Sequence, residues 1–137
     1  MTCRYTERQT PCPTVERSRK ETPVITSIAL LKARDGLSRA EFINYYEKHH
    51  VPLILSLAPA PVYYARNYLP DAEDRAFDAD FDVVTHMKFA SQEDRKAWLA
   101  LVLTEGSGVA EDEARFLDRT KTRAWVVEEY TLDGVLL

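Results

Sequence analysis

Cysteine is scarce in this chain of 137 residues, which has only two. Cys3 and Cys12 both lie within the first 23 residues, and no second pair completes a zinc site, so neither a structural disulfide nor a zinc centre is expected. The chain also lacks an apolar run of the roughly 20 residues that a membrane span needs. Its first residues lack the apolar stretch of a secretory signal. These absences together predict a cytoplasmic protein.

An excess of positive charge is absent as well. The formal net charge is −4 and the pI is near 5.4. Nucleic acids and anionic membranes both require a basic surface on their partners, so neither is an expected partner. Residues 1–23 carry a net charge of +2, which leaves −6 on the remainder. The part of the chain that is predicted to fold is therefore its acidic part.

One domain preceded by an arm is the predicted organisation. Residues 1–23 contain three prolines and almost no large apolar residues, so they cannot bury enough surface to offset the entropy of ordering. They are predicted to form a disordered N-terminal arm. Residues 24–137 fit a single core, because typical domains contain about 100 to 150 residues.

The first half of this domain predicts a strand followed by a helix. Residues 24–32, VITSIALLK, are a β-branched and aliphatic run that ends at a turn over residues 34–36, which is typical of a buried strand. Ser38 and Glu41 then form a capping box that starts a helix. Pro52 disfavours the helical conformation at the preceding residue, so the helix is expected to end near His50.

The second half predicts three strands and two helices. Prolines flank a strand over residues 62–69, as expected at a sheet edge, and VVTHMKF at 83–89 is the next strand. Ser91 caps a second helix, a short helix covers residues 111–117, and the last strand covers 124–131. The order βαββαβ predicts an α+β, ferredoxin-like fold, with one antiparallel sheet and its helices on one face. The uncovered face predicts a homodimer, since a second copy would cover it.

Three segments resemble EthD-domain proteins. The pattern F-x-x-Y-Y-E-x-x-H-x-P-L, from Phe42 to Leu53, resembles the signature of their first helix. The segments YARNY at 64–68 and EDEARFLDR at 111–119 agree with it in order. The resemblance implies a dimeric α+β barrel with a mostly apolar pocket between sheet and helices, and without a metal. Many fungal members are similar to tailoring enzymes of aromatic polyketide pathways, which are decarboxylases or dehydratases.

Strand alternation predicts which side chains enter that pocket, because alternate residues point to opposite faces. Thr85 belongs to the more apolar set of its strand and is expected to face the helices, while His86 faces the other side. Fold relatives suggest that the set containing Arg66 also faces the pocket. The substrate-binding residues are predicted to be Ser27, Tyr64, Tyr68, Thr85, Phe116 and Trp125.

Three catalytic residues are predicted: His50, Arg66 and Tyr46. His50 lies on the buried stripe of the helix and matches the family motif, and its imidazole can exchange a proton near neutral pH. Arg66 offers a planar fork for a carboxylate or phenolate, and Tyr46 lies one turn before His50. Two plainer interpretations stay open. His50 can instead cap the last carbonyls of the helix, and Arg66 can instead pair with an acid of the loop at 71–82.

Metal sites are not predicted in this sequence. His49 and His50 are neighbours on a helix and diverge by about 100° around its axis, and His86 belongs to the other face of the sheet. Residues 78–82, DADFD, imitate the start of a calcium loop. The glycine and the twelfth-position glutamate of that loop are absent.

The resulting hypothesis is a cofactor-independent lyase that decarboxylates or dehydrates an aromatic polyketide intermediate, with aromatisation supplying much of the driving force. Its partner would be a small aromatic or polyphenolic substrate. Two alternatives use the same pocket: a polyketide cyclase or cofactor-free monooxygenase, and a protein that binds an aromatic metabolite without converting it. Fold alone does not choose among them.

Overall fold

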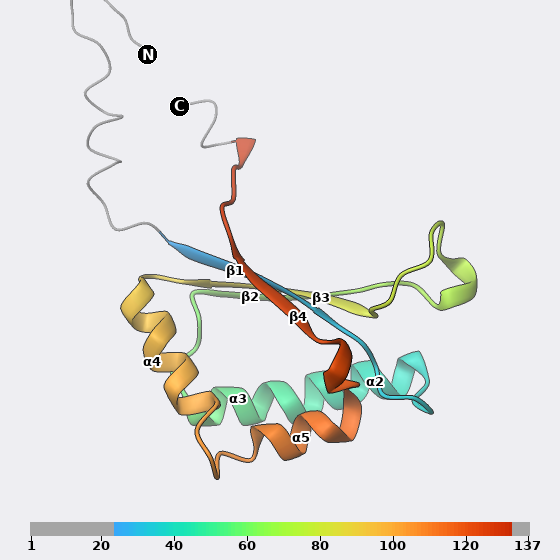
Figure 1. Cartoon of the computed structure of the whole chain (residues 1–137), viewed down its shortest axis with the longest axis horizontal. Helices are drawn as coiled ribbons and strands as arrows, with labels where there is room; N and C mark the ends of the chain where they lie inside the picture. The colour runs from blue at the N-terminus through green and yellow to red at the C-terminus, as the bar shows by residue number, and fades with distance from the viewer. Residues whose placement is uncertain (1–23, 133–137) are drawn as a thin grey trace, which may run out of the picture.

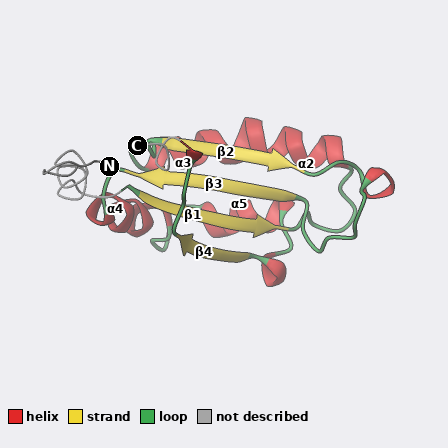
Figure 2. Ribbon diagram, turned by 90° about the horizontal axis from the view of Figure 1, so that it is seen from above, coloured by secondary structure: helices red, strands yellow, loops and turns green. Residues whose placement is uncertain are grey.

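A four-stranded antiparallel sheet organises the chain. In the computed structural model, which describes residues 24–132, the strands are β1 (Ile25–Leu31), β2 (Tyr63–Tyr68), β3 (Val83–Phe89) and β4 (Arg123–Val127). Their order in the sheet is β2-β3-β1-β4, as Figure 2 shows. The prediction of β2 as an edge strand is therefore confirmed. The predicted arm at 1–23 lies outside the described residues.

The α-helices lie on one side of this sheet (Figure 1). They are α2 (Arg39–Tyr45), the π-helical turn η1 (Tyr46–His50), α3 (Val51–Leu57), α4 (Gln92–Val102) and α5 (Val109–Phe116), with short 3-10 turns at η2 (Ala72–Asp74) and η3 (Arg119–Lys121). This arrangement confirms the predicted α+β, ferredoxin-like fold. None of the helices within residues 24–132 is long and apolar enough to cross a membrane.

The first helix is longer than the sequence predicts. It begins at the capping box, where Ser38 Oγ accepts a hydrogen bond from the Glu41 amide at 3.1 Å. It does not end at His50 but continues through η1 into α3, as far as Leu57. Pro52 lacks an amide donor, and in a regular α-helix its ring would clash with the carbonyl group four residues earlier. The wider π turn directly before it, closed by a bond from the Val51 amide to the Tyr46 carbonyl, lets the helix pass this proline.

The last strand is shorter than the sequence predicts. β4 ends at Val127 rather than at Thr131, and residues 128–132 leave the sheet and pass above β1 and β3 toward β2 (Figure 2). Glu129 of this segment pairs with Lys88 on β3, where the two charged groups lie 2.7 Å apart. The segment therefore crosses the open face of the sheet, which we define as the face away from the helices.

The core consists of two clusters on the helix side. One joins the sheet to α2 and α5 and includes Phe42, Val83 and Phe116. The other lies where α3, α4 and α5 meet and includes Ile54 and Val102. At the centre of the sheet, β1 presents the small side chains of Ser27 and Ala29 beside these clusters, so the space between sheet and helices is not filled there.

Candidate functional site

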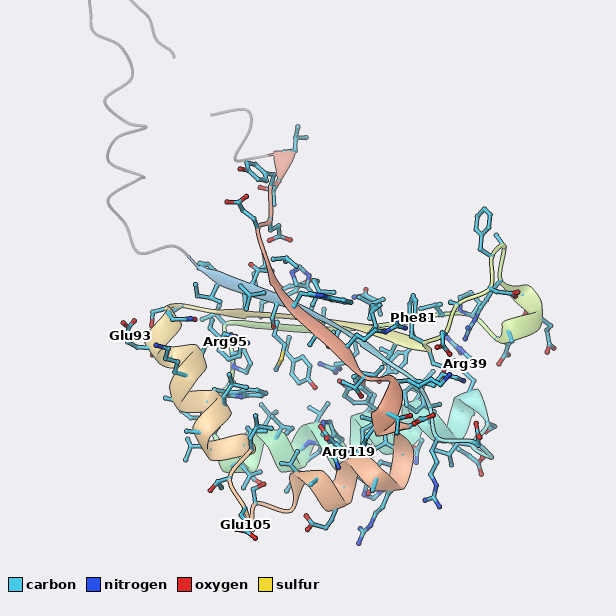
Figure 3. The ribbon with its side chains drawn as sticks, in the orientation of Figure 1. Arg39, Phe81, Glu93, Arg95, Glu105 and Arg119 are labelled. Carbon is cyan, nitrogen blue, oxygen red and sulfur yellow. The ribbon has the colours of Figure 1, made fainter. Side chains whose placement is uncertain are left out.

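A cavity of about 260 Å³ occupies this unfilled space. Its volume lies just below the roughly 300 to 1,000 Å³ that ligand pockets commonly have. Six of the nine residues predicted for the site border it, namely Ser27, Tyr46, His50, Tyr64, Thr85 and Trp125. The remaining lining is largely apolar and comes from β1, β3, β4, α3 and α4, with Glu113 of α5 as its acid. Figure 3 shows side chains from the sheet and from the helices converging on this space.

His50 is fixed by a carboxylate that sequence reasoning did not select. Its Nδ1 atom lies 2.8 Å from Oδ2 of Asp112, and Oδ1 of Asp112 accepts a hydrogen bond from the Tyr45 hydroxyl at 2.6 Å. Both His50 and Asp112 are buried. A carboxylate beside Nδ1 favours the imidazole tautomer that carries the proton on Nδ1. No other described residue bonds to the ring, so Nε2 is the nitrogen left for a ligand.

The length of the helix excludes the interpretation of His50 as a helix-capping residue. The helix continues beyond it to Leu57, so His50 does not cap the last carbonyls of a helix. Its neighbour His49 is exposed and packs on the Tyr45 ring, with the ring centroids 4.8 Å apart. The divergence of these two histidines is the one expected for adjacent helical residues.

Two tyrosine hydroxyls meet at the cavity wall. The Tyr46 and Tyr64 oxygens lie 3.0 Å apart, so one hydroxyl donates to the other and the second proton is left for a ligand. Burial raises the pKa of both phenols, and their mutual contact raises that of Tyr46 further. Both therefore stay protonated around neutral pH. They can donate a hydrogen bond to a developing negative charge but do not act as bases.

Arg66 is placed differently from its predicted role. Its guanidinium forms a bidentate pair with Glu47 of η1, in which Nε lies 2.9 Å from Oε2. The same carboxylate accepts a hydrogen bond from Tyr68 at 2.5 Å. The hydrogen bond from Arg66 holds the pKa of Glu47 below its usual range, against the opposing effect of burial. Arg66 and Tyr68 are on the helix face, as fold relatives suggest, but neither borders the cavity.

Two predicted walls of the pocket also need correction. Phe116 is completely buried in the core, where it packs against Phe42 and against the His50 ring, with 4.9 Å between the latter centroids. It supports His50 from behind and does not border the cavity. Trp125 pairs in register with Ile28 and is 51% exposed, so its indole belongs to the open face although the residue borders the cavity at the sheet edge.

His86 and the acidic loop at 71–82 do not border the cavity. His86 is on the open face, 3.4 Å from Glu129, at a distance for an ion pair. Among the described residues no cluster of three histidine, cysteine or acidic side chains has the spacing of a metal site. Asp82 of the acidic loop is held by Arg75 and by the Ala33 amide, so it is a structural anchor rather than a solvated acid. The lining of the cavity contains one arginine, Arg95 of α4.

The sheet order, the helices on one face and the cavity between them define a ferredoxin-like α+β domain with a cavity on its helix side. The chain belongs to the EthD domain family, whose sequence profile matches residues 34–120. No match is found among curated proteins.

Solved structures with this fold come from several bacteria. An EthD family protein of Bacillus halodurans is 16% identical with a TM-score of 0.57, over 79% of this chain and 100% of that one. An EthD-like protein of Ralstonia eutropha is 17% identical with a TM-score of 0.55, over 82% and 98%. A dimeric protein of unknown function from Bacteroides fragilis, with a ferredoxin-like fold, is 14% identical with a TM-score of 0.51, over 77% and 96%. At these identities the similarity establishes the fold alone.

Proposed function

We propose that this protein is a lyase that acts without a cofactor on an aromatic polyketide intermediate, by decarboxylation or by dehydration with aromatisation. The observation that carries the proposal is the buried pair of His50 and Asp112 at an apolar cavity. A histidine that borders a cavity, is oriented by a carboxylate at one nitrogen and has its other nitrogen left for a ligand is the arrangement that proton transfer requires. The resemblance of the first helix to EthD-domain proteins supports the class of substrate.

In the dehydration, Nε2 of His50 removes the proton from the carbon next to a carbonyl group. The enolate oxygen that forms accepts a hydrogen bond from the hydroxyl pair of Tyr46 and Tyr64. The hydroxyl group at the β carbon then leaves as water with the proton that His50 returns. Loss of water completes the aromatic ring, which supplies much of the driving force.

In the decarboxylation, a β-keto acid loses carbon dioxide and leaves the same type of enolate. The tyrosine pair would stabilise its oxygen, and the protonated imidazole of His50 would give its proton to the carbon. Both reactions therefore use the same two groups of the cavity. Asp112 would stabilise the imidazolium in each of them without touching the substrate.

The test is an incubation of the full chain with aromatic β-keto acids and with β-hydroxy ketones of one to three rings, without metal or nucleotide. Release of carbon dioxide or a mass loss of one water supports the proposal. Ring closure without loss of mass, or uptake of oxygen, would identify a cyclase or a monooxygenase instead. Saturable binding of these compounds without conversion would identify a binding protein.

We also propose that the protein is a homodimer formed by the open faces of two sheets. This face carries Trp125, and Tyr63 is exposed on the same side. The segment that crosses the face bears Tyr130 and Leu132, which are 79% and 69% exposed. Apolar side chains gathered in this way are typical of an interaction surface, and the relative from Bacteroides fragilis is described as dimeric.

Sedimentation of the full chain at micromolar concentration tests this assembly. Wild-type protein should sediment as a dimer. Trp125→Glu places a charge on the open face and should shift the protein to the monomer. Phe77→Glu is the control, since Phe77 is 86% exposed in the loop between β2 and β3, and it should leave the dimer intact. A monomeric wild-type protein would overturn the dimeric barrel.

A further inference from the structure

Arg95 is the cation on the α4 wall of the cavity. Four residues of α4 at spacings of three and four border the cavity, and Arg95 is the first of them, followed by Trp98, Leu99 and Val102. Figure 3 shows Arg95 on the inner side of α4, toward the space beneath the sheet, whereas Glu93 lies on the outer side. The side chain is half-buried. The guanidinium thus belongs to the cavity wall rather than to the outer surface.

Arg95 also has no partner among the described residues. Arg66 is bound by Glu47, and Arg119 lies 3.2 Å from Glu113, the acid that borders the cavity. The guanidinium of Arg95 makes no ion pair and no hydrogen bond within residues 24–132. A cation on an apolar wall loses part of its hydration without gaining a counter-charge, so an anion that binds there is favoured by both effects.

The surroundings indicate which kind of anion fits. Trp98 lies next along the α4 stripe and packs against Phe89, with their ring centroids 5.4 Å apart. A flat ring can pack on these side chains while a planar carboxylate faces the planar guanidinium. His50 lies on a different wall, that of η1.

We propose that Arg95 is the carboxylate-binding residue of the cavity and that its ligands are aromatic carboxylic acids. This rests on the proposed function in one respect, that the cavity is the substrate site. A cation that holds a carboxylate stabilises it against loss as carbon dioxide. The carboxylate bound by Arg95 is therefore one that the reaction retains, and the bond that breaks lies near His50. Arg95 sets specificity and takes no part in proton transfer.

The experiment is calorimetric titration of the full chain with 2-naphthoate and with its neutral analogue 2-naphthamide. Arg95→Gln should weaken binding of naphthoate about 10-fold, as expected for one charge-assisted contact, and should leave binding of the amide unchanged. Lys96→Gln is the matched control. It removes the same charge from the next residue of α4, which is exposed and does not border the cavity, and both ligands should bind it as they bind wild type.

The outcomes separate this inference from the proposed function. Equal losses for acid and amide in Arg95→Gln, no loss for either, or no binding of naphthoate to wild-type protein would each overturn the inference. His50→Gln should bind naphthoate normally, because binding does not need proton transfer. Selective loss of the acid in Arg95→Gln, together with absence of turnover in the wild-type assay, would retain the inference and reject the lyase.

Discussion

Two clusters of similar composition lie on neighbouring faces of the first helix. In one, the Glu47 carboxylate binds Arg66 and a tyrosine hydroxyl. In the other, the Asp112 carboxylate binds His50 and a tyrosine hydroxyl. Each cluster thus joins a carboxylate to a nitrogen group and a phenol that both lie on another part of the chain. Their chemistry differs because the nitrogen groups differ and because only one cluster reaches the cavity.

The cluster at Glu47 is permanently charged and holds the structure together. Arg66 does not lose its proton at any relevant pH, and its side chain is 21% exposed beside the cavity rather than in it. The cluster at Asp112 contains a histidine whose side chain is only 7% exposed and which borders the cavity. A carboxylate paired with a nitrogen group therefore becomes a candidate for catalysis when the nitrogen group can exchange a proton with a ligand.

The strongest test of this difference is His50→Gln. Glutamine keeps the approximate size and a hydrogen-bonding end but removes the imidazole, so turnover of the substrate found in the assay should fall about 10²- to 10⁴-fold. The melting temperature should change only modestly. His49→Gln is the control, since this neighbour is exposed and outside the cavity, and it should keep full activity. A folded and fully active His50→Gln protein would remove this residue from the mechanism.

A smaller effect is expected from Asp112→Asn. The variant keeps the shape of the side chain but no longer provides the charge that orients the imidazole, so kcat should fall about 10²-fold while KM changes little. Both constants are measured on the same substrate. Glu111→Gln removes a charge from the exposed neighbour on α5 and should match wild type. An unchanged kcat, or a rise in KM alone, would contradict the role of Asp112 as a positioning residue.

The smallest effect on activity is expected in the other cluster. Glu47→Gln should leave kcat near wild type but lower the free energy of unfolding at pH 7 by about 1 kcal/mol, because the Arg66 guanidinium loses its counter-charge.

The pH dependence of this loss follows from the lowered pKa of Glu47, which is due first to the hydrogen bond from Arg66. A folded-state pKa below the unfolded value of about 4.3 means that the carboxylate stabilises the fold above that pH. The stabilisation disappears as pH falls through the lower folded value. Urea unfolding should therefore show the full difference from wild type at pH 7 and a smaller one at pH 3. Glu73→Gln, at an exposed acid, serves as control, and a constant difference across pH would disprove the linkage.

Local patterns predict much of the fold. Residues 83–89 form β3 with the predicted bounds, and Ser91 caps α4, where its Oγ accepts a hydrogen bond from the Asp94 amide at 3.1 Å. These features depend on side chains within a few positions of each other. The end of the first helix is not set by such local side chains alone, because the effect of Pro52 depends on whether a wider turn precedes it.

The site was harder to predict because its bonds join distant parts of the chain. His50 and Asp112 are 62 positions apart, and Arg66 pairs with an acid of the first helix rather than with one in the loop after β2. One pattern does point to Asp112. It lies between Val109 and Phe116 on the buried stripe of α5, and an acid in such a position requires a partner.

Because of the π turn at residues 46–50, the number of residues in this segment matters more than the identity of its exposed ones. The turn inserts additional backbone between α2 and α3, and each residue of a helix advances the side chains by about 100°. Loss of one residue there, even the exposed Lys48, would rotate α3 relative to α2 by that amount. Either Ile54 would leave the core or His50 would turn away from Asp112. Substitutions at Lys48 should therefore be tolerated. Deletion of the same residue would instead rotate α3 relative to α2 and disrupt either the core position of Ile54 or the pairing of His50 with Asp112.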